Sequence, residues 1–244
     1  MITMTGGWGA VERWRGGWVA GLAARLVVGG VVVAALPGRT VPLAAQEPER
    51  VPTIPAGVPA VFLPVQSSQP TAGGAWLGGV ASERAVVDLL NAELGFALGE
   101  EEGAASWALP DKVEKRLARN PTLKVDARHL SYHGLLRKPE AHAQIYEPLH
   151  TQLRQIAALF DARIVILPMV VWYRPATPEE EAAAVKAGLE NPGLGRAVLL
   201  AAVIDVRRSA VLWHGTIEGA RGEPTLRAIL TTLGLRTAAQ LAPS

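Results

Sequence analysis

The sequence contains no cysteine among its 244 residues. This absence excludes a disulfide framework, a zinc site with thiolate ligands and thiol catalysis. It also excludes a lipid anchor, which would need a cysteine at the cleavage site. Absence of cysteine is compatible with an oxidising compartment outside the cytoplasm, but it does not by itself establish one.

The chain also lacks a strong excess of either charge. It has 24 Lys and Arg against 22 Asp and Glu, a formal net charge of +2. Residues 1–45 contain four arginines and one glutamate, so the remainder has 20 basic and 21 acidic residues, a net charge of about −1. No dense basic patch stands out in that remainder. We therefore expect no nucleic-acid partner.

The N-terminal segment has the three-part pattern of a secretory leader. Arginines at positions 13, 15 and 25 precede an uncharged apolar run, residues 26–36, and small residues follow up to Ala45. We predict export, with residues 1–45 as a signal peptide cleaved after Ala45. The alternative is an uncleaved membrane anchor over residues 16–38, which is long enough to span a bilayer but would place Arg25 inside it.

Both readings place the remainder on the periplasmic side, either free or anchored to the inner membrane. Residues 46–58 are rich in proline and read as a linker. Residues 59–235 are predicted to form a single α/β domain with a polar, helical insertion at 174–195. Residues 236–244 are predicted to be a C-terminal tail.

Hydrophobic periodicity predicts the elements of this domain. Strands are expected over 59–65, 106–110, 162–173, 196–205 and 210–219. Helices are expected over 83–98, 112–119, 141–160 and 224–233, with a short helix after Thr177. Asp111 is the expected cap of the second helix, and Pro168 indicates a bulge in the longest strand. The fold class is therefore α/β, a mixed sheet of about five strands with helices packed on it.

Four passages carry a resemblance to a known family: Phe62-Leu63-Pro64, 107–110 (WALP), 156–165 (IAALFDARIV) and 203–213 (VIDVRRSAVLW). Together they resemble the N-terminal domain of TolB and the related α/β domain of CsgG-type envelope proteins. Two departures are the absence of room for a β-propeller and Ser209, which stands where that family usually has glycine. The resemblance implies an anticodon-binding-like topology and a non-enzymatic periplasmic module that contacts other envelope proteins.

Candidates for chemistry are few. His129 and His133 have the i,i+4 spacing that can bind a metal on a helix, but no H-E-x-x-H motif is present, so they are weak candidates and we favour a solvated pair. The glycine-rich loop 73–79 matches no phosphate-binding motif. Ser131 and Ser209 lie in no G-x-S-x-G context. We therefore predict no catalytic residues, no cofactor and no resident metal.

The aromatic residues are better candidates for partner binding, because exposed aromatic side chains are common anchors of protein interfaces. The candidates are the aromatic residues Trp76, Trp172, Tyr173 and Trp213, together with Arg174, which follows Tyr173. The leading hypothesis is an exported, non-enzymatic envelope interaction or scaffold protein that docks onto other envelope or membrane-complex proteins. A histidine-based metal-binding protein and a periplasmic small-ligand carrier are the alternatives.

Overall fold

The computed structural model describes residues 51, 54–69, 82–137, 139 and 143–242. These residues belong to the unit Gln46–Ser244. The predicted leader, the anchor alternative over 16–38 and loop 73–79 lie outside the described residues. Within those residues, no helix combines the length and apolar character needed to cross a bilayer.

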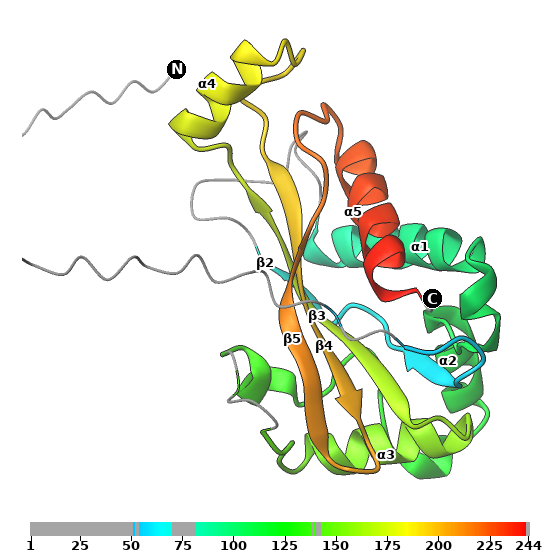
Figure 1. Cartoon of the computed structure of the whole chain (residues 1–244). Coiled ribbons are helices and arrows are strands. Elements are labelled where there is room, and N and C mark those ends of the chain that lie inside the picture. Colours follow the sequence, from blue (N-terminus) through cyan, green and yellow to red (C-terminus); the bar gives the residue numbers. More distant parts are fainter. Residues whose placement is uncertain (1–50, 52–53, 70–81, 138, 140–142, 243–244) are drawn as a thin grey trace, which may run out of the picture. The chain divides into compact units, whose positions relative to one another are not determined.

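The two longest apolar runs form the centre of the sheet. β3 (Ile164–Arg174) and β4 (Arg196–Asp205) pair antiparallel along their whole lengths. β5 (Ala210–Glu218) continues the sheet antiparallel to β4, while β1 (Ala60–Phe62) and β2 (Ser67–Gln69) both pair parallel with the other side of β3. The predicted mixed sheet of about five strands is thereby confirmed (Figure 1).

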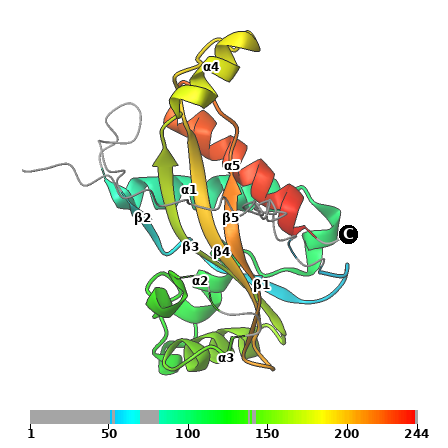
Figure 2. The same cartoon turned by 60° about the vertical axis from the view of Figure 1, so that its left-hand side comes forward.

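Both faces of the sheet are covered by helices (Figure 2). α1 (Glu83–Gly99) and α5 (Leu226–Leu241) pack on one face, where Phe62, Leu199 and Trp213 belong to the core. α2 (Pro110–Ala118) and α3 (Leu149–Leu159) pack on the other face, over Leu167 and Ile204. The alternation of side chains along each strand supplies both cores, because successive residues point to opposite faces.

Local sequence explains where several elements begin. Ser82 accepts a hydrogen bond from the backbone N–H of Ala85 and caps α1. Thr177 and Glu180 form a capping box at the start of α4 (Pro178–Lys186), which confirms the short helix in the insertion. The pairing of β3 with β4 shifts register between Pro168 and Val170, which confirms the predicted irregularity at Pro168.

The predicted strand over 106–110 is wrong. A 3₁₀ turn, Glu102–Ser106, leads into this segment, and only an isolated bridge joins Ala108 to Val61. Asp111 does not cap α2 either, because the N-cap residue is Leu109 and Pro110 occupies the first turn. Proline fits that position because its missing N–H would have no partner in the first turn.

Two helix boundaries also differ from the predictions. The helix expected over 141–160 begins only at Leu149, because Pro148 lacks the N–H with which a helix would continue upstream. The last helix, expected to end at 233, runs to Leu241, and Ala238 and Leu241 are buried in the core. Ile54, in the stretch expected to be a linker, is also buried there. Apolar residues near both ends of the unit therefore complete the α1–α5 core.

Candidate functional site

The residues expected to bind a partner are not brought together. Trp76 lies outside the described residues. Tyr173 is buried and accepts a hydrogen bond from the backbone N–H of Gly195 at 2.6 Å. Trp213 is buried in the α1–α5 core, whereas Trp172 is half-buried against the core on the opposite face. A single contact surface built from Trp172 and Trp213 is therefore not formed.

Arg174, the remaining member of that set, belongs to an ionic cluster at the base of α4. It donates two hydrogen bonds to Glu180, at 3.0 and 3.2 Å. Arg196 bridges Glu180 at 3.2 Å and Glu218 at 2.6 Å. The hydrogen bond from the Thr177 backbone N–H, together with Arg174, lowers the pKa of Glu180 to about 2. The cluster fastens the insertion to the ends of β3, β4 and β5.

His129 and His133 do not share a face of an α-helix. His129 lies in a turn and its Nδ1 is 2.7 Å from a carboxylate oxygen of Asp126, while His133 lies in a 3₁₀ turn and stacks on the ring of Tyr132. Nowhere in the described ranges do three or more His, Asp and Glu side chains come together as potential metal ligands. The i,i+4 argument for this pair therefore loses its helical basis.

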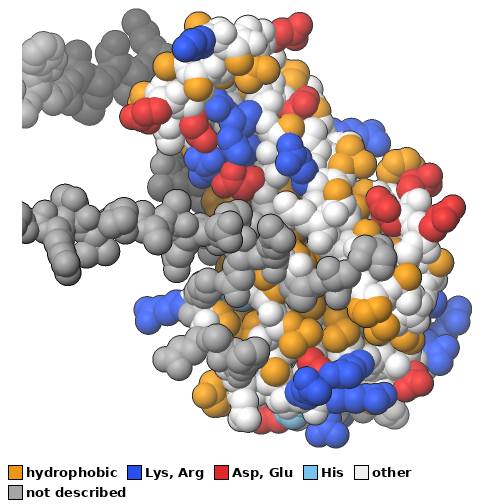
Figure 3. All heavy atoms as spheres, viewed as in Figure 1, with side chains coloured by type: hydrophobic (Ala, Val, Ile, Leu, Met, Phe, Trp, Pro, Cys, Tyr) orange, Lys and Arg blue, Asp and Glu red, His pale blue; other side chains and the backbone are white. Residues whose placement is uncertain are grey.

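Positive charge gathers instead at one end of the unit. Three cations on α2 and the C-cap residue Arg119 have i, i+3, i+4 and i+7 spacing, which places them on one exposed face. Four more come from α3, the start of β3 and the β4–β5 turn, and Figure 3 shows Lys and Arg side chains collected at the lower end of that view. We call this surface the basic end: Lys112, Lys115, Arg116, Arg119, Arg154, Arg163, Arg207 and Arg208, with Asp111, Asp161 and Asp205 among them.

The basic end contrasts with the rest of the unit. Its eight basic and three acidic residues carry a net charge of +5. The described residues hold 18 basic and 18 acidic residues in all, so their remaining part has 10 basic and 15 acidic residues, a net charge of −5. A nearly neutral chain is therefore strongly polarised. Such polarisation orients an approaching partner and raises its rate of association.

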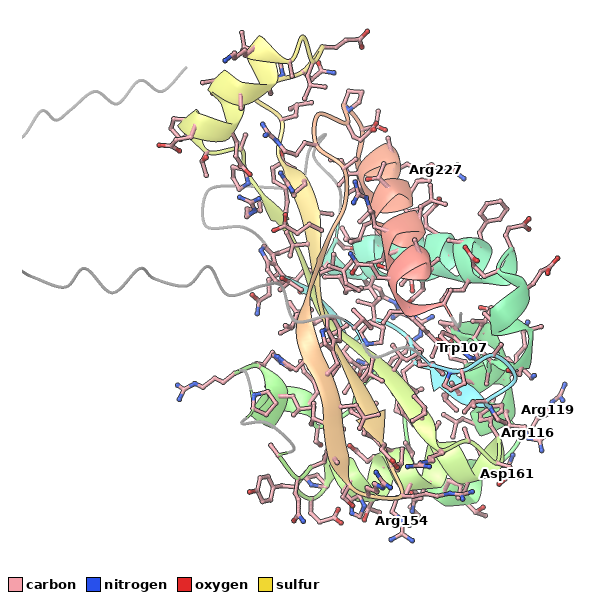
Figure 4. The ribbon with its side chains drawn as sticks, in the orientation of Figure 1. Trp107, Arg116, Arg119, Arg154, Asp161 and Arg227 are labelled. Carbon is pink, nitrogen blue, oxygen red and sulfur yellow. The ribbon has the colours of Figure 1, made fainter. Side chains whose placement is uncertain are left out.

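Two hollows shape this surface. The first, of about 650 Å³, lies between α2 and the end of α3, and we call it the α2 hollow. The second, of about 700 Å³, lies between α3 and the β4–β5 turn, and we call it the turn hollow. Ala158 and Asp161 line both, so Asp161 forms the ridge between them. Figure 4 shows Arg116 and Arg119 on one side of Asp161 and Arg154 on the other.

The β4–β5 turn is built on a buried carboxylate. Asp205 is 1% exposed and accepts hydrogen bonds from Arg163 Nε at 2.8 Å and from the backbone N–H groups of Arg207 and Arg208. Burial acts to raise the pKa of Asp205, but the hydrogen bonds from Arg163 and the backbone outweigh it, and the pKa lies below its ordinary value. The turn therefore presents Arg207 and Arg208 from a fixed base.

Ser209 ends the turn in a left-handed conformation, with φ +54°. Glycine adopts this conformation without strain, and proteins of the TolB family, which the sequence resembles, usually have glycine at this position. The Ser209 hydroxyl instead lies 2.6 Å from Nε2 of His150, and Nδ1 of His150 lies 3.4 Å from a carboxylate oxygen of Glu147. This chain of contacts joins the turn to the start of α3.

Sequence reasoning missed the basic end, and the expectation that no dense basic patch is present is wrong. The residues of the basic end come from four segments, so the cations do not form a continuous run in the sequence. One pattern would have been informative: the spacing of Lys112, Lys115, Arg116 and Arg119 marks one helix face, opposite the buried Val113 and Leu117.

No protein family and no curated protein sequence matches the chain. Among solved structures, the chain is similar to the PelC dodecamer from Paraburkholderia phytofirmans, with 13% identity, a TM-score of 0.33 and coverage of 78% of this chain and 93% of that one. It is also similar to the C-terminal domain of LpoB from Salmonella enterica, with 10% identity, a TM-score of 0.30 and coverage of 68% and 84%. At such low TM-scores these likenesses support no statement about function, and membership of a TolB-like family stays a prediction.

Proposed function

We propose that this chain is an exported, non-enzymatic interaction module of the cell envelope, which docks through its basic end onto an acidic surface of another envelope protein. The leader pattern of residues 1–45 supports the location, with an inner-membrane anchor over 16–38 as the alternative. The observation that carries the docking role is the polarised charge of the described residues, +5 at the basic end and −5 elsewhere. The net negative charge over the rest of the unit repels an acidic partner, so the partner approaches productively only at the basic end.

The cations of the basic end are available to a partner. Arg116, Arg119 and Arg154 are exposed and form no ion pair with a described residue. A guanidinium group donates in a planar fork that matches a carboxylate, so these arginines can form two parallel hydrogen bonds with an Asp or Glu of a partner. Arg116 and Arg154 lie on helices and Arg119 is the C-cap residue of α2, and a rigid helical base loses less conformational freedom on binding than a loop does.

Site-specific photo-crosslinking tests this proposal. The full chain is expressed in its own host with a photoreactive residue in place of Arg119, and in a second strain in place of Arg227. Arg227 is an exposed arginine on α5, far from the basic end in Figure 4, and therefore a matched control. We expect one envelope protein to crosslink at position 119 and not at 227, through a segment rich in Asp and Glu.

The result that contradicts the proposal is equally specific. Crosslinks at both positions in equal yield, or at position 119 only to a segment without acidic residues, would show that the basic end is not the docking surface. N-terminal sequencing of the same purified protein separates a cleaved leader from an anchor.

A further inference from the structure

We infer that the turn hollow binds a phosphate group, carried by a soluble phosphomonoester or by a lipid head group. This inference goes beyond the docking role, because the hollow lies to one side of the α2 face and needs no protein partner to be occupied. Its walls are α3 and the β4–β5 turn, and it is lined among others by His150, Arg154, Gln155, Arg207 and Ser209.

Two guanidinium groups supply the charge that a phosphate dianion requires. Arg154 makes no side-chain hydrogen bond or ion pair with a described residue, and among the described residues the Arg207 guanidinium pairs only with Asp161, at 3.9 Å. Arg154 projects from α3 and Arg207 from the turn, so the two cations lie on opposite walls. Guanidinium pairs of this kind suit phosphate, because each donates two parallel hydrogen bonds to its oxygens.

Neutral groups of the hollow suit an ion with several acceptor oxygens. Gln155 is half-buried, and its amide makes no hydrogen bond with a described residue. The Ser209 hydroxyl is already engaged with Nε2 of His150, at 2.6 Å, so it is not counted among the donors to the ligand. A carboxylate has two oxygens, whereas a phosphate monoester offers three terminal ones. The number of donors around the hollow therefore favours phosphate over a carboxylate.

The walls of the hollow are held in position before any ligand arrives. Asp205 fixes the turn through Arg163 and two backbone N–H groups, and the Ser209–His150 contact fixes the turn against α3. A site whose walls are already fixed loses less free energy on binding than one that must be ordered. Asp161 on the ridge is the one carboxylate lining the hollow, and it opposes anion binding.

Calorimetry and vesicle sedimentation test the inference on the exported protein as purified from its host. Soluble probes are inorganic phosphate and glycerol phosphate, with acetate as the carboxylate comparison. Vesicle probes contain phosphatidic acid, with phosphatidylcholine vesicles as the uncharged comparison. Binding of glycerol phosphate with weaker vesicle binding identifies a soluble ligand, and the opposite order identifies a lipid head group.

Two double variants of equal charge separate a site from diffuse attraction. Arg154→Gln with Arg207→Gln removes both cations of the turn hollow, and we expect affinity for the favoured phosphate probe to fall about tenfold or more. Arg116→Gln with Arg119→Gln removes two cations of the α2 hollow, and we expect a loss of about twofold to threefold from long-range attraction alone. All four arginines are exposed, so folding is retained, and thermal unfolding verifies it.

Equal losses in the two double variants would overturn the inference, as would acetate binding as tightly as phosphate or the absence of binding to every phosphate probe. These results do not decide the docking proposal. That proposal is tested by crosslinking at position 119 to a protein partner, with a different variant.

Discussion

The hydroxyl oxygen of Ser209 lies 2.6 Å from Nε2 of His150, and this contact joins the β4–β5 turn to the first turn of α3. The two segments are 59 residues apart in the chain. Together they form the walls of the turn hollow. The arginines that the turn and α3 contribute to the basic end are therefore held in a fixed relative position.

Substitution of Ser209 separates the effect of backbone strain from that of the hydroxyl. Ser209→Ala removes the hydrogen bond to His150 and keeps a side chain at φ +54°, so we expect the free energy of unfolding to fall by about 1 kcal/mol or slightly more. Ser209→Gly removes the same bond but relieves the strain, and we expect it to lie within about 0.5 kcal/mol of the parent protein. Urea unfolding of the three proteins measures both differences, and a glycine variant less stable than the alanine variant would contradict this account.

Asp205 is expected to be the residue on which the turn depends most. Asp205→Ala leaves the Arg163 guanidinium and two backbone N–H groups without their acceptor, so we expect a loss of about 2–3 kcal/mol in the free energy of unfolding. Asp161→Asn is the matched control, since the side chain of Asp161 is 99% exposed and asparagine tolerates its positive φ of +47°. Equal stability of the two variants in urea would show that the buried carboxylate is dispensable.

The Glu180 cluster predicts a dependence of stability on pH. The pKa of Glu180 is about 2 in the folded protein and about 4.5 in the unfolded chain, so its contribution is fully present above pH 4.5. That contribution is lost as the pH falls from 4.5 towards 2. We expect Glu180→Gln to have a lower Tm than the parent protein at pH 7, with a difference that shrinks over this window.

Glu181→Gln is the control for that measurement, because it removes an equal charge from the same helix. Glu181 makes no ion pair with a described residue, so its variant should follow the parent protein across the pH range. A Tm difference for Glu180→Gln that stays constant between pH 7 and pH 2.5 would contradict the assignment.

Substitution of Asp161 is expected to increase the affinity for phosphate. It lines both hollows as a lone carboxylate on the ridge between them, and its negative charge opposes binding of an anion. We expect Asp161→Asn to raise the affinity for the favoured phosphate probe by about twofold to fivefold, as expected for an exposed charge a few ångströms away. Calorimetry at low salt measures the change, and it should diminish as the salt concentration rises. Unchanged or weaker affinity would place the ion elsewhere.

Much of the fold followed from the sequence because long elements have strong periodicity. β3, β4, β5, α1 and α4 lie where apolar spacing, caps and turn residues place them. The errors occur where a short segment depends on tertiary contacts. Residues 106–110 read as a strand, yet only Ala108 forms a bridge, because the adjacent edge of the sheet is the short β1.

The candidate site was less predictable than the fold, for a physical reason. Arg154 and Arg207 are 53 positions apart in the sequence, and only the packing of α3 beside the β4–β5 turn makes them neighbours in one hollow. The net charge of the chain is near zero because the charges of the basic end and of the rest of the unit cancel, so the net charge gives no sign of the polarisation. Ser209 was noticed as a departure from glycine, but its contact with His150 depends on that same packing.

The central claim is that the basic end docks onto an acidic partner, and a charge-swap experiment tests it most directly. Arg116→Glu with Arg119→Glu is introduced into the full chain, and recovery of the crosslinked partner in co-purification at low salt is compared with that of the parent protein and of Arg227→Glu. We predict that the double variant loses the partner, that Arg227→Glu retains it, and that Lys substitutions at the crosslinked acidic residues of the partner restore binding to the double variant. Undiminished recovery with the double variant, at any salt concentration, would contradict the account.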